Sequence, residues 1–418
     1  MSETRVRRSS SLVLTLLLLA YILNFLDRQI LGILAQPIQG DLHLSNAEFG
    51  AIGGTAFAIL YAVLGIPLAY VADRTSRSAV VSGSLAIWSA FTALCGAATG
   101  FWSLFVSRLG VGFGEAGGVA PSYALITDYF PPGQRARALA IFSLGIPLGL
   151  GGGAFIGARL AALFGWRAAF LVMGLAGLVL APIVRTVVRD VPRASDAGAR
   201  APFRAVFSLF ARKPAFWLLA FASAASSLTG YGLALWTPKV IMLTFGLDLV
   251  STGNFVASLL VIGGCAGVFA GGWLADRLGS TDRRWYARLP AIAWLITAPT
   301  FVAGFFAPTL WLAWILLLVP NALNILWLGP VITALQHLVP GPMRSTASAS
   351  FLLIINLIGL GLGPWLMGRL ADVLNASYGA DSLRYSAVAC LAFYLVAALL
   401  ACLAAGPLKR SWVADENP

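Results

Sequence analysis

Long apolar runs are the feature that most constrains the fold of this chain. Stretches of about 20 or more apolar residues recur along the sequence, and a helix of that length crosses a hydrocarbon layer about 30 Å thick. Of the 418 residues, 59% are hydrophobic and only 11% are charged. That charged fraction is about half of what an ordinary soluble domain carries. The sequence therefore predicts an all-α membrane protein and argues against a soluble fold.

Residues that break helices divide the apolar sequence into twelve predicted membrane spans. These spans lie at 12–39, 46–72, 79–99, 102–129, 135–163, 166–188, 214–244, 250–276, 285–307, 309–338, 344–372 and 381–405. The connections between them are short, except for one at the middle of the chain. We therefore predict six-helix bundles at 1–188 and 214–418, joined by a cytoplasmic linker at 189–213; a short cytoplasmic tail ends the second bundle.

Within this linker, apolar residues recur at helical spacing beside basic ones. They are Phe203, Val206, Phe207 and Phe210. The pattern favours a short interfacial helix on the anionic inner leaflet. A disordered basic linker is the alternative.

The basic residues predict the orientation of the chain. The formal net charge is +12, but the basic residues are not gathered on one face among stacking aromatics, as nucleic-acid binding would need. They lie instead on every second connection, which is the pattern of cytoplasmic loops. With an even number of spans, this pattern places both termini in the cytoplasm.

Four charged residues interrupt the first and fourth spans. They are Asp27, Arg28, Arg108 and Glu115. An ionised side chain at mid-bilayer costs at least about 2.5 kcal/mol, so each must face protein or water rather than lipid. Arg108 and Glu115 are close to two helical turns apart and share one face, while Asp27 and Glu115 fall at the same depth. The four residues are therefore candidates to line one cavity.

These charges suggest a coupling mechanism. Burial favours the neutral form of a carboxylic acid, whereas a nearby arginine favours the ionised form. We hypothesise that Asp27 and Glu115 bind protons, while Arg28 and Arg108 tune them and attract an anionic group of the substrate. A static charge-paired cluster that braces the first half is the alternative.

Other polar residues are weaker candidates. Asn24, Lys239 and Asn324 are included as substrate-binding or charge-tuning residues, although interhelical hydrogen bonding explains Asn324 equally well. The cysteines show no metal-binding spacing, so no metal is expected. The glycine string at 112–117 lies inside a span rather than after a strand, and no Walker sequence occurs. We therefore expect no cofactor, and a proton gradient as the energy source.

Two sequence matches indicate a duplicated ancestral half. Ala72-Asp73-Arg74 matches Ala275-Asp276-Arg277, and Pro131-x-x-x-Arg135 matches Pro340-x-x-x-Arg344. The members of each match lie about half the chain apart. Weak internal repetition of this kind is typical of transporters whose binding site lies between repeats.

The loop Gly272-Trp273-Leu274-Ala275-Asp276-Arg277-Leu278-Gly279 resembles the loop signature of the major facilitator superfamily, with a partial copy at 69–77. The resemblance implies twelve transmembrane helices in two pseudo-symmetric bundles that work by alternating access. It also implies gating roles for residues in and near these loops, namely Asp73, Arg74, Arg77, Arg135, Asp276, Arg277 and Arg344. Asp73 meets the negative end of its own helix dipole, so it needs a positive partner, either Arg77 or the N-terminus of a neighbouring helix. Ordinary solvated loop charges are the alternative.

Further strings are similar to the Spinster branch of that superfamily, in a bacterial version. They are Asn24-Phe25-Leu26-Asp27-Arg28, Arg108 to Ala116, Trp236-Thr237-Pro238 and Arg344-Ser345-Thr346-Ala347. This resemblance implies proton-coupled transport of lysophospholipids or sphingoid lipids by a monomeric, multi-pass protein of the cell inner membrane, in contact with membrane lipids. A small organic anion or a lipophilic drug is the alternative substrate. We expect neither an enzyme nor a receptor, because the chain offers no catalytic constellation and no sizeable soluble domain.

Overall fold

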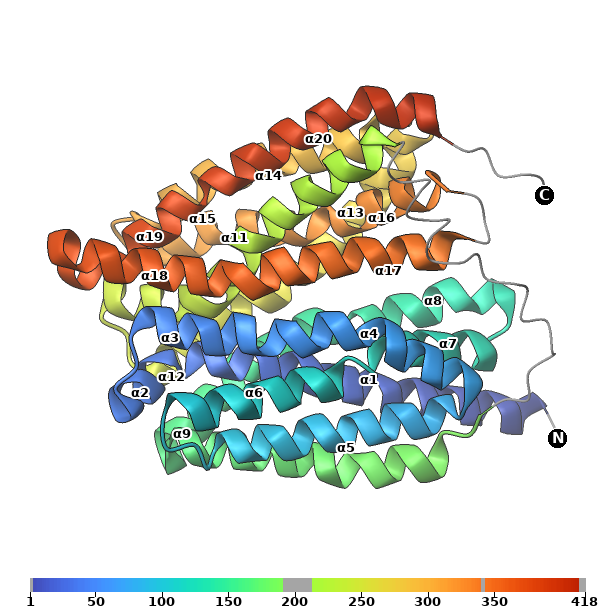
Figure 1. The fold of residues 1–418 in the computed structure, drawn as a ribbon, viewed down its shortest axis with the longest axis horizontal. Helices are drawn as coiled ribbons and strands as arrows, with labels where there is room; N and C mark the ends of the chain where they lie inside the picture. Colours follow the sequence, from blue (N-terminus) through green and yellow to red (C-terminus); the bar gives the residue numbers. More distant parts are fainter. Residues whose placement is uncertain (1–2, 191–212, 340–342, 413–418) are drawn as a thin grey trace. The chain divides into compact units, whose positions relative to one another are not determined.

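The computed structural model describes residues 3–190, 213–339 and 343–412. Within these ranges every regular element is a helix and no strand occurs (Figure 1). The predicted all-α class is therefore confirmed. The predicted linker helix with Phe203, Val206, Phe207 and Phe210 lies outside the described residues.

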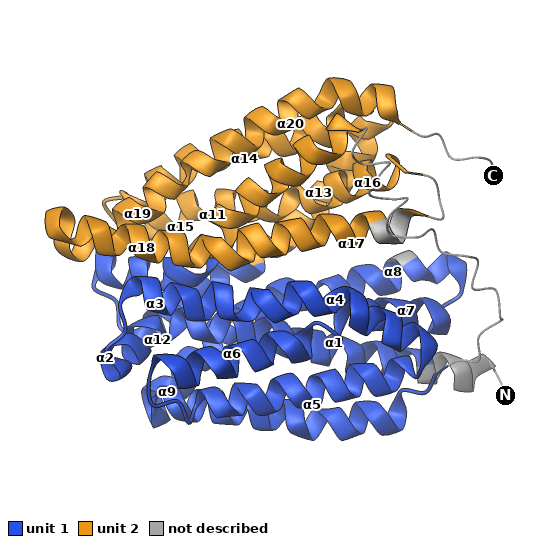
Figure 2. Ribbon diagram, in the orientation of Figure 1, with its two compact units in different colours: residues 1–194, 234–261 blue, residues 195–233, 262–418 orange. Residues whose placement is uncertain are grey.

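The chain forms two compact units, coloured separately in Figure 2. Unit 1 comprises Met1–Ala194 and Ala234–Val261, and unit 2 comprises Ser195–Leu233 and Ile262–Pro418. The predicted bundle boundaries at 188 and 214 stay a prediction. The compact units are not the same as the predicted bundles: residues 234–261, predicted as part of the second bundle, belong to unit 1.

The helices of unit 1 follow in chain order. They are α1 (Glu3–Ile33), α2 (Ala35–Leu42), α3 (Asn46–Ala51), the π-helical turn η1 (Ile52–Ala56), α4 (Phe57–Arg74), α5 (Arg77–Cys95), α6 (Phe101–Glu115), α7 (Val119–Tyr129), α8 (Pro132–Ser143), α9 (Gly145–Val187), the last part of α11 (Pro214–Phe245), α12 (Leu249–Ser258) and the start of the π-helical turn η2 (Leu259–Gly263). In Figure 1, α7 and α8 lie at one end of this unit and α2 at the other.

Unit 2 contains the remaining helices. They are the first part of α11, the end of η2, α13 (Gly264–Gly279), α14 (Trp285–Phe305), α15 (Leu310–Leu326), α16 (Leu328–Gln336), α17 (Arg344–Ile355), the π-helical turn η4 (Asn356–Leu360), α18 (Gly361–Tyr378), the 3₁₀ turn η5 (Gly379–Asp381), α19 (Ser382–Cys390) and α20 (Ala392–Ser411).

Close glycine contacts explain why 234–261 packs with the N-terminal helices. A Cβ atom on Gly32 would lie 3.0 Å from the carbonyl oxygen of Leu235, and one on Gly151 would lie 2.3 Å from a methyl carbon of Val261. A Cβ atom on Gly253 would lie 2.7 Å from the carbonyl oxygen of Ala154. Small residues of this kind allow helix backbones to approach closely inside a membrane. The end of α11, α12 and the start of η2 are therefore part of the core of unit 1.

Nine runs of the described residues are long and apolar enough to cross a membrane, which confirms a multi-pass membrane protein. Two of these runs are much longer than one crossing needs. Pro132–Val187 has 56 residues and contains Gly165, whose φ of 83° and ψ of 161° interrupt the helix. Ala347–Ser411 has 65 residues and is interrupted by η5. Each long run therefore contains a break in its helix.

Candidate functional site

Three glycines hold α6 against its neighbours in unit 1. A Cβ atom on Gly110 would lie 2.2 Å from the ring of Phe91, and one on Gly112 would lie 2.2 Å from the carbonyl oxygen of Phe57. On Gly114 it would lie 2.4 Å from the backbone nitrogen of Trp88. Because α4 supplies Phe57 and α5 supplies the other two contacts, these glycines fix the depth and rotation of α6. They thereby place Arg108 and Glu115, which lie on the same helix.

An ion pair joins α1 to α6. The Nε and Nη2 atoms of Arg28 lie 2.8 Å and 2.7 Å from Oε2 of Glu115. The Glu115 side chain is fully buried, and that of Arg28 is 13% exposed. A charge buried to this degree is tolerated when it is paired and hydrogen-bonded. Arg28 therefore compensates the buried carboxylate of Glu115.

Aromatic rings surround the Arg28 guanidinium. Its central carbon lies 5.0 Å from the ring centroid of Phe25, 4.7 Å from that of Phe57 and 4.8 Å from that of Tyr61. A cation over the face of an aromatic ring is attracted by the ring quadrupole, most strongly where water is excluded. The site thus combines a cation with an apolar aromatic wall built from α1 and α4.

Asp27 is held from a third helix, α5. The hydroxyl of Thr92 donates a hydrogen bond of 3.0 Å to Oδ2 of Asp27, and both side chains are buried. Thr92 was not among the predicted site residues. A single threonine in an apolar span gives no signal in the sequence, because such hydroxyls commonly bond to a carbonyl of their own helix.

Arg108 completes the cluster. It is 2% exposed and lies 5.3 Å from the ring centroid of Phe57. It is close enough to both Asp27 and Glu115 to act on their charges. Its Nε and Nη1 atoms have no hydrogen-bond partner among the described protein groups. The structure therefore brings the four predicted residues together, and we call Asp27, Arg28, Arg108 and Glu115 the charge cluster.

The remaining binding candidates lie in different places. Asn24 is buried on α1 beside Glu115. Lys239 donates hydrogen bonds to Oε1 of Gln39 at 2.6 Å and Oδ1 of Asn46 at 3.1 Å, so its described bonds are with α2 and α3 rather than with the charge cluster. Asn324 belongs to unit 2, where its side-chain oxygen accepts a hydrogen bond of 2.8 Å from the Tyr394 hydroxyl.

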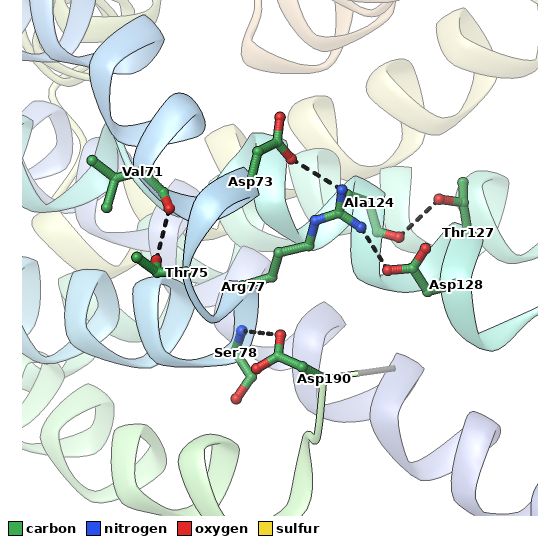
Figure 3. Close-up of polar contacts among 9 residues, drawn as sticks. All are labelled: Val71, Asp73, Thr75, Arg77, Ser78, Ala124, Thr127, Asp128 and Asp190. Carbon is green, nitrogen blue, oxygen red and sulfur yellow. Dashed lines mark hydrogen bonds and ion pairs between the residues drawn. The ribbon is translucent and has the colours of Figure 1, made fainter. Parts of the chain in front are cut away.

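The end of unit 1 that carries Asp73 and Arg77, here called the motif end, contains a second ionic arrangement (Figure 3). Arg77 bridges two carboxylates: Nη2 lies 3.0 Å from Oδ1 of Asp73, and Nη1 lies 2.6 Å from Oδ2 of Asp128 on α7. The expected pairing of Asp73 with Arg77 is therefore present. Asp128 was not predicted, because only the fold reveals that α7 ends beside the start of α5.

A further unpredicted carboxylate, Asp190, caps α5 at the motif end. Its Oδ1 atom accepts a hydrogen bond of 3.1 Å from the backbone N–H of Ser78, and its other oxygen accepts one from the Ser76 hydroxyl. A carboxylate at a helix N-terminus satisfies free N–H groups and opposes the positive end of the helix dipole. Asp190 thus ties the segment after α9 to the first turn of α5.

The other predicted gating residues make different contacts. Arg74 stacks on Tyr70 at 4.0 Å, and Nε of Arg135 donates a hydrogen bond of 3.1 Å to the carbonyl oxygen of Phe130. In unit 2, Arg277 lies 5.3 Å from the ring centroid of Trp273, and Asp276 is exposed. The side chain of Arg344 lies outside the described part of the chain.

The Arg77 bridge gives a testable prediction. We expect a double-mutant cycle of Arg77→Met and Asp128→Asn to give a coupling free energy of about 1 kcal/mol, because the two side chains are in contact and only partly exposed. Unfolding of the purified protein by denaturant in detergent micelles measures it. Arg74→Met is the matched control, because Arg74 stacks on a ring, and its cycle with Asp128→Asn is expected to give almost no coupling. A coupling for Arg77 no larger than for Arg74 would contradict the bridge.

Comparison with known proteins identifies the family. A model of the Major Facilitator Superfamily matches residues 17–364. The chain belongs to this superfamily. It is 35% identical over 398 residues to an MFS-type efflux pump of Mycolicibacterium smegmatis, and this match covers 94% of this chain and 92% of that protein. It is 26% identical over 380 residues to the hexuronate transporter of Bacillus subtilis, and this match covers 88% of this chain and 89% of that protein.

A solved structure supports the finer resemblance. The crystal structure of a bacterial homolog to the human lysosomal transporter Spinster, in an inward-facing and unoccupied conformation, matches with a TM-score of 0.88 and 29% identity. The match covers 99% of this chain and 100% of that chain. The predicted resemblance to the superfamily and to its Spinster branch is therefore confirmed. Membership of this family indicates a transporter rather than an enzyme.

Proposed function

We propose that this protein is a secondary active transporter that moves an amphipathic, lipid-like substrate, such as a lysophospholipid or a sphingoid lipid, by alternating access coupled to protons. The observation that carries the proposal is the charge cluster. Two carboxylates and two guanidinium groups from α1 and α6 lie together in the interior of unit 1, beside aromatic rings. Intramembrane ionisable groups are costly and commonly mark ion or proton pathways.

The pairing within the cluster supports the proposed proton coupling. Glu115 is buried and its Oε2 atom lies against Arg28, so a movement of α1 relative to α6 that separates them would favour the protonated acid. Asp27 lies near Glu115 and Arg108, so its proton affinity depends on which partners those residues have. A cycle that exchanges these contacts would therefore take up and release protons. The proton gradient serves as energy source, and no metal or cofactor is needed.

The surroundings of the arginines support the proposed substrate class. Among the described residues, two donor atoms of Arg108 have no acceptor, and Arg28 lies among Phe25, Phe57 and Tyr61. An anionic head group would satisfy the free donors, and an apolar tail would suit the aromatic wall. The resemblance of the chain to the Spinster branch implies the same substrate class.

A small organic anion is the second candidate substrate. It would engage the same arginines without an apolar tail, and the 26% identity to a hexuronate transporter favours it. A lipophilic drug is the third candidate, and the chain is also similar to an efflux pump. Direct transport of each class distinguishes the three.

In this proposal the chain crosses the membrane twelve times. Seven of the nine runs supply one span each. Pro132–Val187 supplies two spans that meet at Gly165, and Ala347–Ser411 supplies two that meet at η5. The helices α6 and α7, which lie outside the nine runs, together supply one more span. The basic connections, both termini and the motif end of unit 1 then lie on the cytoplasmic side of the cell inner membrane. The protein acts as a monomer among membrane lipids.

Neutral replacement of the carboxylates tests the coupling. We expect Asp27→Asn and Glu115→Gln each to reduce transport driven by a pH gradient by about 100-fold or more in proteoliposomes, since a fixed neutral side chain cannot carry a proton. Exchange of substrate without a gradient should persist. Undiminished proton-driven transport in both variants would leave the cluster a static brace.

Asp41 provides the matched control for these variants. It lies on α2, where a hydrogen bond from Arg167 lowers the pKa of its carboxyl group below the ordinary value. A lowered pKa keeps Asp41 ionised at neutral and mildly acidic pH, and the contact is lost only as the pH falls through that lowered value. We therefore expect Asp41→Asn to retain proton-driven transport and its pH dependence.

A further inference from the structure

The Thr92 hydroxyl bonds to a carboxylate on a neighbouring helix, whereas other threonines of the described residues bond to backbone carbonyls. Among the described residues, the hydroxyls of Thr297 and Thr252 donate to carbonyl oxygens of the preceding turn, Thr297 to Ala293 and Thr252 to Asp248. Thr92 instead donates across to Asp27 on α1, at 3.0 Å. Its hydroxyl is therefore directed at a carboxylate of another helix rather than at its own backbone.

The backbone around Thr92 is clamped on two sides. A Cβ atom on Gly174 of α9 would lie 2.5 Å from the backbone nitrogen of Ala93, and one on Gly114 of α6 would lie 2.4 Å from that of Trp88. A Cβ atom on Gly177 would lie 2.0 Å from the hydroxyl oxygen of Ser89. Contacts this close leave α5 little freedom to rotate or slide. The position of the Thr92 hydroxyl is thus fixed by backbone packing.

The hydroxyl is the direct partner of Asp27 among the described residues. Thr92 is fully buried, Asp27 is 2% exposed, and the second carboxylate oxygen of Asp27 has no hydrogen-bond partner in the described part of the chain. Arg28 is the next residue on α1, but it forms an ion pair with Glu115. The ionised form of Asp27 therefore receives its hydrogen bond from Thr92.

Other charged and titratable groups around Asp27 act without such a bond. Arg108 and Glu115 face it from α6, and Cys95 lies near it on α5. The last part of α11 carries Lys239, which bonds to α2 and α3.

The three arginines of α9, which packs along α1, are engaged elsewhere. Arg159 bonds to the carbonyl oxygen of Phe155, Arg167 pairs with Asp41, and Arg185 lies 3.5 Å from the Ser78 hydroxyl.

We infer that Thr92 is a positioning residue that sets the pH at which Asp27 takes up its proton. The inference rests on the proposed function, because it assumes that Asp27 is a proton-binding group of the transport cycle. A hydroxyl donates a stronger hydrogen bond to a carboxylate than to the neutral acid, so Thr92 stabilises the ionised form. Removal of the hydroxyl favours protonation, and the proton then binds at a higher pH. Thr92 also holds the carboxylate toward α5.

The test measures the pH dependence of the conformational change without any substrate. The half-buried Cys265 and the exposed Cys402 are first replaced with serine. Nitroxide labels are then attached to cysteines introduced as Gly133→Cys on α8 and Arg410→Cys on α20. The distance between the labels is followed from acidic to alkaline pH in lipid nanodiscs. The midpoint of the change reports proton binding.

Four substitutions separate the effect of the hydroxyl from that of its surroundings. Thr92→Val keeps the branched shape and removes the donor, and we expect its midpoint to rise by about one pH unit, the shift that matches loss of a hydrogen bond to a charged group. Thr92→Ser keeps the donor and should restore the original midpoint. Thr297→Val removes a buried hydroxyl that bonds to its own helix in unit 2, so its midpoint should not move. Thr92→Ala gives a second donor-free variant should the valine variant fail to fold.

The outcomes distinguish this inference from the proposed function. If Asp27→Asn abolishes the pH response while Thr92→Val and Thr92→Ala leave or lower the midpoint, the role of Thr92 is wrong and proton binding by Asp27 stands. If Asp27→Asn leaves the pH response intact, the proposed coupling is wrong and the role of Thr92 is wrong with it. A raised midpoint in the donor-free variants, restored by serine, supports both.

Discussion

Replacement of Arg28 with methionine is expected to lower the free energy of unfolding by about 3–5 kcal/mol. The reason is that Glu115 is fully buried and would lose the guanidinium that lies 2.7 Å from its carboxylate. Removal of one partner of a buried ion pair is costly, because Glu115 must then either take up a proton or stay ionised with only the nearby charge of Arg108. Denaturant unfolding in detergent micelles at neutral pH measures the loss.

Two further variants show whether the Glu115 carboxyl group is the cause. Glu115→Gln in the Arg28→Met background removes that group and should restore most of the lost stability. Arg159→Met is the matched single control, because Arg159 is a partly exposed arginine that stacks on Phe155, and it should change stability by no more than about 0.5 kcal/mol. The explanation fails if Arg28→Met costs no more than Arg159→Met, or if Glu115→Gln restores nothing.

Gly112→Leu is expected to prevent unit 1 from folding. Even the Cβ atom of alanine would lie 2.2 Å from the carbonyl oxygen of Phe57, and this obstacle is backbone rather than a flexible side chain. Gly112→Ala should therefore lower the free energy of unfolding by about 1–3 kcal/mol through overpacking. Yield of monodisperse protein measures the first effect, and denaturant unfolding measures the second.

Gly65 on α4 is the control for Gly112. A Cβ atom there would meet nothing within 4 Å. Gly65→Ala should therefore raise stability by about 0.5–1 kcal/mol, because alanine is the better helix former. Equal effects of alanine at the two positions would show that the close approach of α6 to α4 is not what constrains Gly112.

Much of the fold could be predicted from the sequence, because the bilayer restricts the options to apolar helices. The predicted break between 163 and 166 falls where Gly165 leaves the helical conformation, and the break between 372 and 381 falls at η5. A glycine with positive φ is also the residue expected at such a turn. The boundaries of the compact units could not be predicted, because they depend on glycine contacts between distant helices.

The charge cluster could be predicted in membership but not in pairing. The energetic cost of bilayer charges places Asp27, Arg28, Arg108 and Glu115 toward protein, and helical spacing places them at a common depth. Neither argument fixes the rotation of α1 against α6. Only the structure shows that Arg28 pairs with Glu115 while Thr92 bonds to Asp27.

Other contacts could not be predicted without tertiary information. Lys239 interrupts an apolar run, and its binding role stays a prediction; the structure adds its hydrogen bonds to Gln39 and Asn46. Asp128 and Asp190 lie at helix ends, where sequence alone does not distinguish a bridging carboxylate from a solvated one. Their partners, Arg77 and the first turn of α5, come from segments distant in sequence.

Reconstitution of the purified wild-type protein into liposomes with an imposed pH gradient tests the central claim most directly. The substrate panel contains a lysophospholipid, a sphingoid lipid, a hexuronate and a lipophilic cationic drug. The account predicts that a lysophospholipid or the sphingoid lipid moves when the gradient is present, that a protonophore abolishes its accumulation, and that Asp41→Asn behaves as wild type while Asp27→Asn does not. Transport of the hexuronate or the drug alone, or lipid transport at the same rate with and without the pH gradient, would contradict the account.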